Sequence, residues 1–144
     1  MCNNNECNCI SEILSVILIL QQNACGDSCL DTCDRGFLGC GSSTLSCNTR
    51  PVMLYLCGSN GDSPWIMPTT KTPDSCGDAG VTCSSVFRIE KLDGCCATFR
   101  VLADNPDPVE VTTIPYVSTN SFFTLNLNCC CAIRCLPDTF VDCI

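Results

Sequence analysis

The sequence predicts a mainly β protein, an antiparallel β-sandwich or jelly-roll-like domain that is cysteine-rich and carries a short N-terminal α-helix. Three observations indicate this fold. Beyond Gly36, short apolar runs alternate with clusters of Gly, Pro, Asn, Asp and Ser, as strands alternate with turns. Residues 122–136 alternate apolar and polar side chains with a period of two. Residues 10–20 instead have apolar side chains at helical spacing.

The N-terminal apolar segment predicts a helix over about residues 10–22, capped by Ser11 or a nearby Asn. Because apolar side chains cover most of its girth, the helix should be buried on more than one side. We expect either an ordinary core helix or one that also contacts a neighbouring subunit. The candidate subunit-contact residues are Ile13, Val16, Ile17 and Leu20.

This segment is not expected to be a signal peptide or a membrane span. The first nine residues contain no Lys or Arg, whereas a secretory signal begins with positive charge. The uninterrupted apolar run, Val16–Leu20, is five residues long, and a bilayer needs about 20. We therefore expect a protein made in the cytoplasm without export.

The strands follow the turn signals along residues 48–144. Pro51–Cys57 is a nearly continuous apolar strand, which is typical of a central position. Trp65–Met67 begins another strand, and residues 109–117 form a further one. Together with the hairpin and the alternating segment below, this gives roughly six or seven strands packed as a sandwich.

Residues 85–104 predict the clearest hairpin. A three-residue loop, Leu92–Gly94, with Gly94 in the left-handed region, sets Phe87 opposite Phe99. This register keeps apolar side chains on one face, whereas a two-residue loop at Asp93-Gly94 mixes the faces.

The same reasoning assigns the neighbouring cysteines to opposite faces of their strands. In the hairpin, Cys95 points to the apolar face and Cys96 to the other. In the alternating segment, Cys129 and Cys131 point inward and Cys130 outward. Adjacent cysteines therefore need disulfide partners in different places.

Composition excludes several classes of function. The chain of 144 residues has 18 cysteines, no histidine and a formal net charge of −8. The negative charge disfavours nucleic-acid binding, and the absence of histidine removes the commonest general base and metal ligand. The carboxylates of Asp104–Asp107 lie in turn-like sequence, where Asp serves the backbone. No catalytic residues and no cofactor are predicted.

A metal site is poorly supported by the cysteine spacings. The sequence contains no C-x-x-C pair, and its Cys25, Cys29 and Cys33 do not have iron–sulfur spacing. A cysteine-cluster metal-binding or redox-buffering protein stays open as the alternative function. A secreted disulfide-rich binding module is a third reading, against which the missing positive N-terminus weighs.

Three stretches together resemble the Bacillus spore coat protein Y/Z family, which includes the exosporium Y protein. They are Asn48–Tyr55, Phe87–Leu102 and Cys129–Leu136, the last reading C-C-C-A-I-R-C-L. Their order and approximate spacing agree with the family, as does a helix followed by a cysteine-rich link containing Phe37-Leu38-Gly39. The resemblance covers roughly residues 7–138.

The resemblance implies a structural protein of the outer spore surface, in the coat crust or the exosporium. Such proteins assemble with themselves into rings, expected to be hexamers, within a hexagonal two-dimensional lattice cross-linked by disulfides. Other coat or exosporium proteins are further partners. Because spore coat proteins are made in the mother-cell cytoplasm and exposed later by its lysis, their thiols can couple after assembly.

Two departures from the family pattern stand out. By position, Cys129, Cys131 and Cys135 match the C-terminal family cysteines. Cys95 or Cys96 matches the family cysteine that precedes Ala97. Here a cysteine at position 130 replaces a usually aromatic residue, which suggests an extra exposed thiol, and the histidine-rich ends of relatives are missing.

The predicted organisation is an N-terminal arm and helix over 1–24, a cysteine-rich link over 25–47 and a β-domain over 48–144, forming one structural domain. Cysteines near the termini or on outward faces are the candidates for inter-subunit disulfides. They are Cys2, Cys7, Cys9, Cys96, Cys130 and Cys143. The cysteines expected to be internal are Cys95, Cys129, Cys131 and Cys135.

Overall fold

The computed structural model describes residues 9–22, 47–58, 63–142 and 144. Within them the protein is mainly β, with antiparallel strands after one α-helix, α1 (Cys9–Gln22). The predicted class is therefore confirmed, and the helix has nearly the predicted bounds. The predicted link lies almost wholly outside the described residues. No helix among the described residues is long and apolar enough to cross a membrane.

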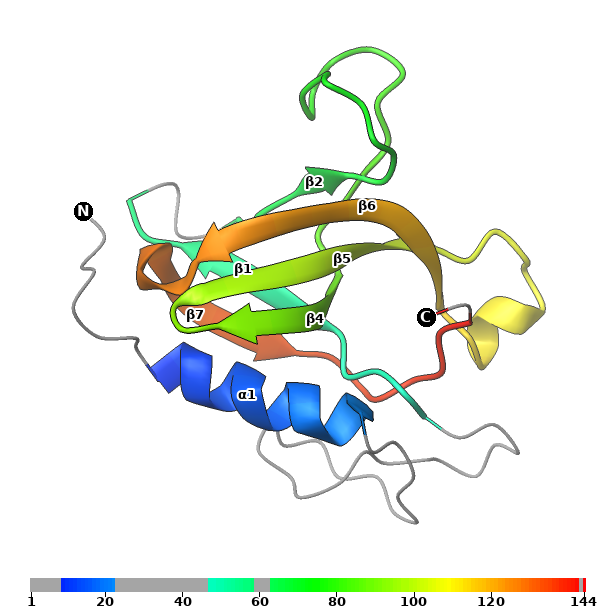
Figure 1. The fold of residues 1–144 in the computed structure, drawn as a ribbon. Coiled ribbons are helices and arrows are strands. Elements are labelled where there is room, and N and C mark those ends of the chain that lie inside the picture. Colours follow the sequence, from blue (N-terminus) through cyan, green and yellow to red (C-terminus); the bar gives the residue numbers. More distant parts are fainter. Residues whose placement is uncertain (1–8, 23–46, 59–62, 143) are drawn as a thin grey trace.

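Seven strands form two sheets in this part of the chain. They are β1 (Val52–Leu56), β2 (Met67–Pro68), β3 (Cys83–Ser84), β4 (Phe87–Asp93), β5 (Cys96–Asp104), β6 (Tyr116–Asn126) and β7 (Cys130–Cys135). The main sheet has the order β6-β5-β4-β1-β7, and β2 pairs with β3 in a separate ribbon. Figure 1 shows β1 and β7 behind β4 and β5, with α1 alongside, so the sheet is curled rather than flat.

The core lies inside this curl and beneath the helix. Side chains from β1, β4, β5, β7 and α1 belong to one hydrophobic cluster. At its centre Phe87, Phe99 and Phe123 stack against one another, with the rings of Phe87 and Phe123 edge to face at 4.8 Å. Such aromatic contacts stabilise a core beyond the area that they bury. The second layer of the expected sandwich is thus supplied by the curl and by α1.

The end of α1 is fixed by a buried glutamine. Gln21, only 6 % exposed, donates from Nε2 to the carbonyl of Ile89 in β4 at 2.9 Å. Its Oε1 accepts from the backbone N–H of Arg50 at 3.1 Å. One amide therefore satisfies a β4 carbonyl and an N–H that precedes β1, and so joins helix and sheet.

A buried ion pair joins the segments that flank the two strands at the back of the curl. Arg50, before β1, binds Asp138, after β7, through Nε–Oδ1 at 2.7 Å and Nη2–Oδ2 at 2.9 Å. Their side chains are only 2 % and 4 % exposed. Beside them Asn48 exchanges two hydrogen bonds with the backbone of Val141, both 2.9 Å long.

The β4–β5 hairpin differs from its predicted register. Gly94 has a φ of +59°, as expected, but the loop is Gly94-Cys95, and Phe87 lies opposite Val101. The predicted pairing of Phe87 with Phe99 is wrong because the turn lies at Gly94-Cys95 instead of Leu92–Gly94, and a bulge between Ile89 and Lys91 then shifts the ladder by one residue. The extra residue allows a short turn while the apolar face stays intact.

Glu90 explains why the bulge is stable. Its carboxylate accepts from Arg88 Nη1 at 2.8 Å and from Arg100 Nε at 2.9 Å, so one residue at the bulge links two neighbouring strands. Arg100 also lies over the ring of Phe122 in β6, 4.6 Å from its centroid.

The predicted strand over 122–136 is interrupted. β6 ends at Asn126, the 3-10 turn η2 (Leu127–Cys129) follows, and β7 begins at Cys130. Asn126 starts this turn by accepting from the N–H of Asn128 at 3.0 Å. A turn in mid-segment breaks the period of two, so Cys130 rather than Cys131 points inward, whereas Ile133 and Cys135 still pack against the core.

The predicted strand over 109–117 is also largely wrong. The segment contains the 3-10 turn η1 (Glu110–Thr112), and β6 begins at Tyr116. Asp107 starts the turn, because its Oδ1 accepts from the N–H groups of Val109 at 2.9 Å and Glu110 at 3.1 Å. These bonds to Glu110 and Val109 lower the pKa of Asp107.

The buried pair predicts a strong effect of Asp138→Asn. The substitution keeps the shape but leaves the Arg50 guanidinium buried without its counter-charge. We expect a loss of about 3–5 kcal/mol in the free energy of unfolding, measured by urea unfolding of the oxidised protein. The exposed Asp74→Asn is the matched control and should change it by less than about 0.5 kcal/mol. Equal effects of the two substitutions would contradict the role of the pair.

Candidate cross-linking site

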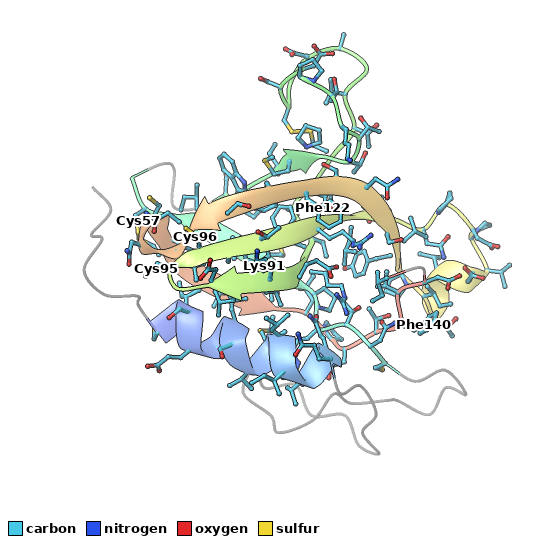
Figure 2. The ribbon with its side chains drawn as sticks, in the orientation of Figure 1. Cys57, Lys91, Cys95, Cys96, Phe122 and Phe140 are labelled. Atoms are coloured by element: carbon cyan, nitrogen blue, oxygen red, sulfur yellow. A yellow bond between two sulfur atoms is a disulfide. The ribbon has the colours of Figure 1, made fainter. Side chains whose placement is uncertain are left out.

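Most described cysteines gather at one end of the main sheet, where β1 ends, the β4–β5 hairpin turns and β7 begins. We call this the cysteine end; it comprises Cys57, Cys95, Cys96, Cys129, Cys130 and Cys131. Figure 2 shows Cys57, Cys95 and Cys96 close together there. The backbone connects the three chain segments, since Cys57 N–H donates to Cys129 at 2.9 Å and Leu127 N–H to Cys95 at 2.8 Å.

Intrachain disulfides hold this end together. Cys57 at the end of β1 bonds to Cys131 in β7, across 74 positions of sequence and a Cα–Cα distance of 5.0 Å. Closing a loop of that length stabilises a fold by about 4 kcal/mol in the chain-entropy account. Cys95, Cys129 and Cys135 are each in a disulfide as well.

Two exposed thiols stand apart from these bonds. Cys9 at the start of α1 and Cys96 on the hairpin are both exposed and free. Cys96 is the first residue of β5, opposite Asp93 of β4 and Asn126 of β6, so a neighbouring strand flanks it on each side. The outward orientation predicted for Cys96 is thus confirmed. Exposed thiols are the ones that can couple to another molecule, because the attacking thiolate must reach its target.

The orientation predicted for Cys130 is wrong. It was predicted to be outward and exposed, but it is 2 % exposed and belongs to the core cluster, while Cys131 lies on the exposed side. The cause is the η2 turn just before it. Burial raises the pKa of the Cys130 thiol, partly offset by backbone hydrogen bonds with Tyr55 and Ala132. A buried thiol of this kind is chemically inert.

The predicted subunit-contact residues of the helix are also partly buried and partly exposed. Ile17 is fully buried and Leu20 is 8 % exposed, and Ile13 packs against the core. Three of the four predicted contact residues therefore face the protein's own core, because the helix lies lengthwise along the sheet. Val16 is on the surface at 36 % exposure, beside Ile19 at 55 %.

Some expectations fall outside this description. Cys2, Cys7 and Cys143 lie outside the described residues. Among the residues that the structure describes, no group of three or more His, Cys, Asp or Glu side chains is placed to hold a metal ion.

The sequence analysis assigned no role to three cysteines that the structure places in disulfides, Cys57, Cys76 and Cys83. Cys57 bonds to Cys131, and Cys76 bonds to Cys83. The second pair had a local signal, since its two members flank a short glycine-containing loop. The first pair had none, because it depends on β1 lying beside β7.

The fold and the site define a class, a small disulfide-stapled β-protein with exposed thiols. A family model described as Spore coat protein Z matches residues 2–138, and the chain belongs to this spore coat family. Membership confirms the resemblance found in the sequence and assigns a structural role at the spore surface. No curated protein and no solved structure matches the chain.

Thiol exposure predicts an order of chemical reactivity. In the folded protein, pulsed alkylation with iodoacetamide should label Cys9 and Cys96 at least about tenfold faster than Cys130, whose labelling requires local opening and a less accessible thiolate. Peptide mass spectrometry measures the three rates. In urea the difference should disappear. Rapid labelling of Cys130 in the native protein would contradict its burial.

Proposed function

We propose that this protein assembles with itself into hexameric rings within a hexagonal two-dimensional lattice of the spore crust or exosporium, and that disulfides between subunits lock the lattice. The role is structural and not enzymatic. The observation that carries the proposal is the exposed Cys96 thiol at the cysteine end, where four of the other five cysteines are in disulfides and the fifth, Cys130, is buried.

The position of Cys96 suits a cross-link. Its strand is hydrogen-bonded to β4 and β6, and Cys96 itself lies opposite Asp93 and Asn126, so the thiol is on a sheet rather than on a loop. A disulfide formed there would hold two domains in a defined relation. Many such links in a sheet reinforce one another, because each subunit is held at several points.

A non-covalent contact must bring subunits together before their thiols couple. The exposed apolar side chains of Val16 and Ile19 on α1 offer one candidate surface. A contact between two different surfaces of the same protein can close into a ring, which is the arrangement that a hexamer requires.

Timing and place fit the chemistry of the thiols. We propose synthesis in the mother-cell cytoplasm without a signal peptide, where thiols stay reduced, followed by oxidation at the spore surface. Other coat or exosporium proteins are the further partners in this proposal, since the lattice must join the layer beneath it.

The test is negative-stain electron microscopy of the protein expressed alone, before and after strong reductant with heat. We expect ordered sheets or rings that form unaided and separate only with reductant. Cys96→Ser should give sheets that separate more readily, whereas Cys130→Ala, which removes a buried thiol, should not weaken them. A monodisperse monomer whose size does not change with reductant would contradict the lattice proposal.

The helix surface is tested separately. Val16→Glu with Ile19→Glu places charge on the exposed side of α1, where it should stop assembly but leave the domain folded. Size-exclusion chromatography with light scattering measures the assembly, and circular dichroism measures the fold. The matched control is Ser15→Glu on the same helix. Sheets that persist with both glutamates present would remove α1 from the contact.

A further inference from the structure

The ribbon of β2 and β3 carries a projecting arm, defined here as residues 65–84. Figure 1 shows the connection between β2 and β3 extending away from the main sheet. At its base the arm is anchored by two hydrogen bonds and by Met67, which packs against the core. Trp65 N–H donates to the carbonyl of Leu54 at 2.7 Å, and Ser121 Oγ donates to the carbonyl of Pro68 at 2.8 Å.

The arm has no core of its own. None of the residues 65–84 is buried. Toward its tip the hydrogen bonds are local, such as Asp78 N–H to Ser75 at 3.1 Å and Ser75 N–H to Asp78 Oδ2 at 2.9 Å. Exposed local hydrogen bonds contribute little net stability. Beyond Met67 at the base, which packs against the main core, the side chains of the arm are exposed or only partly buried. The rest of the arm therefore depends on a covalent constraint to keep one conformation.

That constraint is the Cys76–Cys83 disulfide, which spans seven positions of sequence. One of its cysteines, Cys76, lines a mainly apolar groove of about 400 Å³. The groove is lined by two segments of the arm, residues 65–68 and residues 72–76. Because Cys83 pairs with Pro68 in the ribbon, the disulfide ties the second segment to the first.

We propose that the Cys76–Cys83 pair is a redox-operated staple, so that the arm groove is present when the disulfide is formed and is lost when it is reduced. Formation removes two protons and two electrons from the thiols, and a low-molecular-weight disulfide such as oxidised glutathione accepts them to give two thiols. This inference is independent of the lattice and holds for a single folded subunit.

The only tryptophan of the chain, Trp65, reports on the groove directly, because it lines the groove together with Cys76. Reduction should shift its fluorescence emission to longer wavelength and increase quenching by acrylamide. The Cys76→Ser/Cys83→Ser variant should give the reduced-type spectrum under oxidising conditions too. Cys9→Ser/Cys96→Ser, which also removes two cysteines, is the matched control and should keep the wild-type response.

Trypsin cleavage after Lys71, an exposed residue of the arm, gives a second readout. Releasing so short a closed loop enlarges the open ensemble by a factor of about 10 to 100, and cleavage should accelerate by a comparable factor. Oxidised Cys76→Ser/Cys83→Ser protein that matches oxidised wild type in emission, quenching and cleavage would overturn the proposal.

A wild-type titration keeps the inference testable even if that variant does not fold. In graded mixtures of reduced and oxidised glutathione, alkylation and mass spectrometry give the reduced fraction of each cysteine. The emission of Trp65 should follow the fraction of reduced Cys76. An emission change that instead follows reduction of Cys57, at the cysteine end, would overturn the assignment to the arm.

Discussion

The ion pair between Arg50 and Asp138 is the constraint on which the arrangement of the sheet depends. Two nearly inaccessible charges are tolerated only when they face each other, so the segment before β1 and the segment after β7 have one permitted relation. That relation sets β1 beside β7, and the same neighbourhood then allows Cys57 to meet Cys131. Because Gln21 accepts a hydrogen bond from the backbone N–H of Arg50, the position of this segment also fixes the end of the helix.

Local patterns predicted the fold class well, because alternation, turn residues and helical spacing are all local properties. The hairpin, the left-handed Gly94 and the outward Cys96 came from such patterns. The register did not, because the turn lies at Gly94-Cys95 instead of Leu92–Gly94. The bulge that keeps the apolar face intact was not predicted either, since Glu90 depends there on two arginines, one of them across the hairpin. The predicted orientation of Cys130 was wrong for a related reason. The η2 turn is specified by one asparagine within an otherwise perfect alternation, and period counting does not register it.

The candidate site was predictable only in part. Exposure at the start of a helix or strand could be inferred for Cys9 and Cys96, whereas disulfide partners far apart in sequence could not, because pairing follows the fold. The arm shows the opposite case. Its disulfide is local and its groove lies within one segment, but a sequence offers no sign that Trp65 and Cys76 line the same groove.

The pairing of β1 with β7 also has a consequence for biosynthesis. About half of the chain separates the two strands in sequence, so β7 leaves the ribosome long after β1. Until then the apolar residues of β1, including Val52 and Leu54, have no partner on that side, so the sheet can close only late in translation or after it. A nascent chain in this state, crowded with reduced thiols, depends on a reducing compartment to avoid premature and incorrect disulfides.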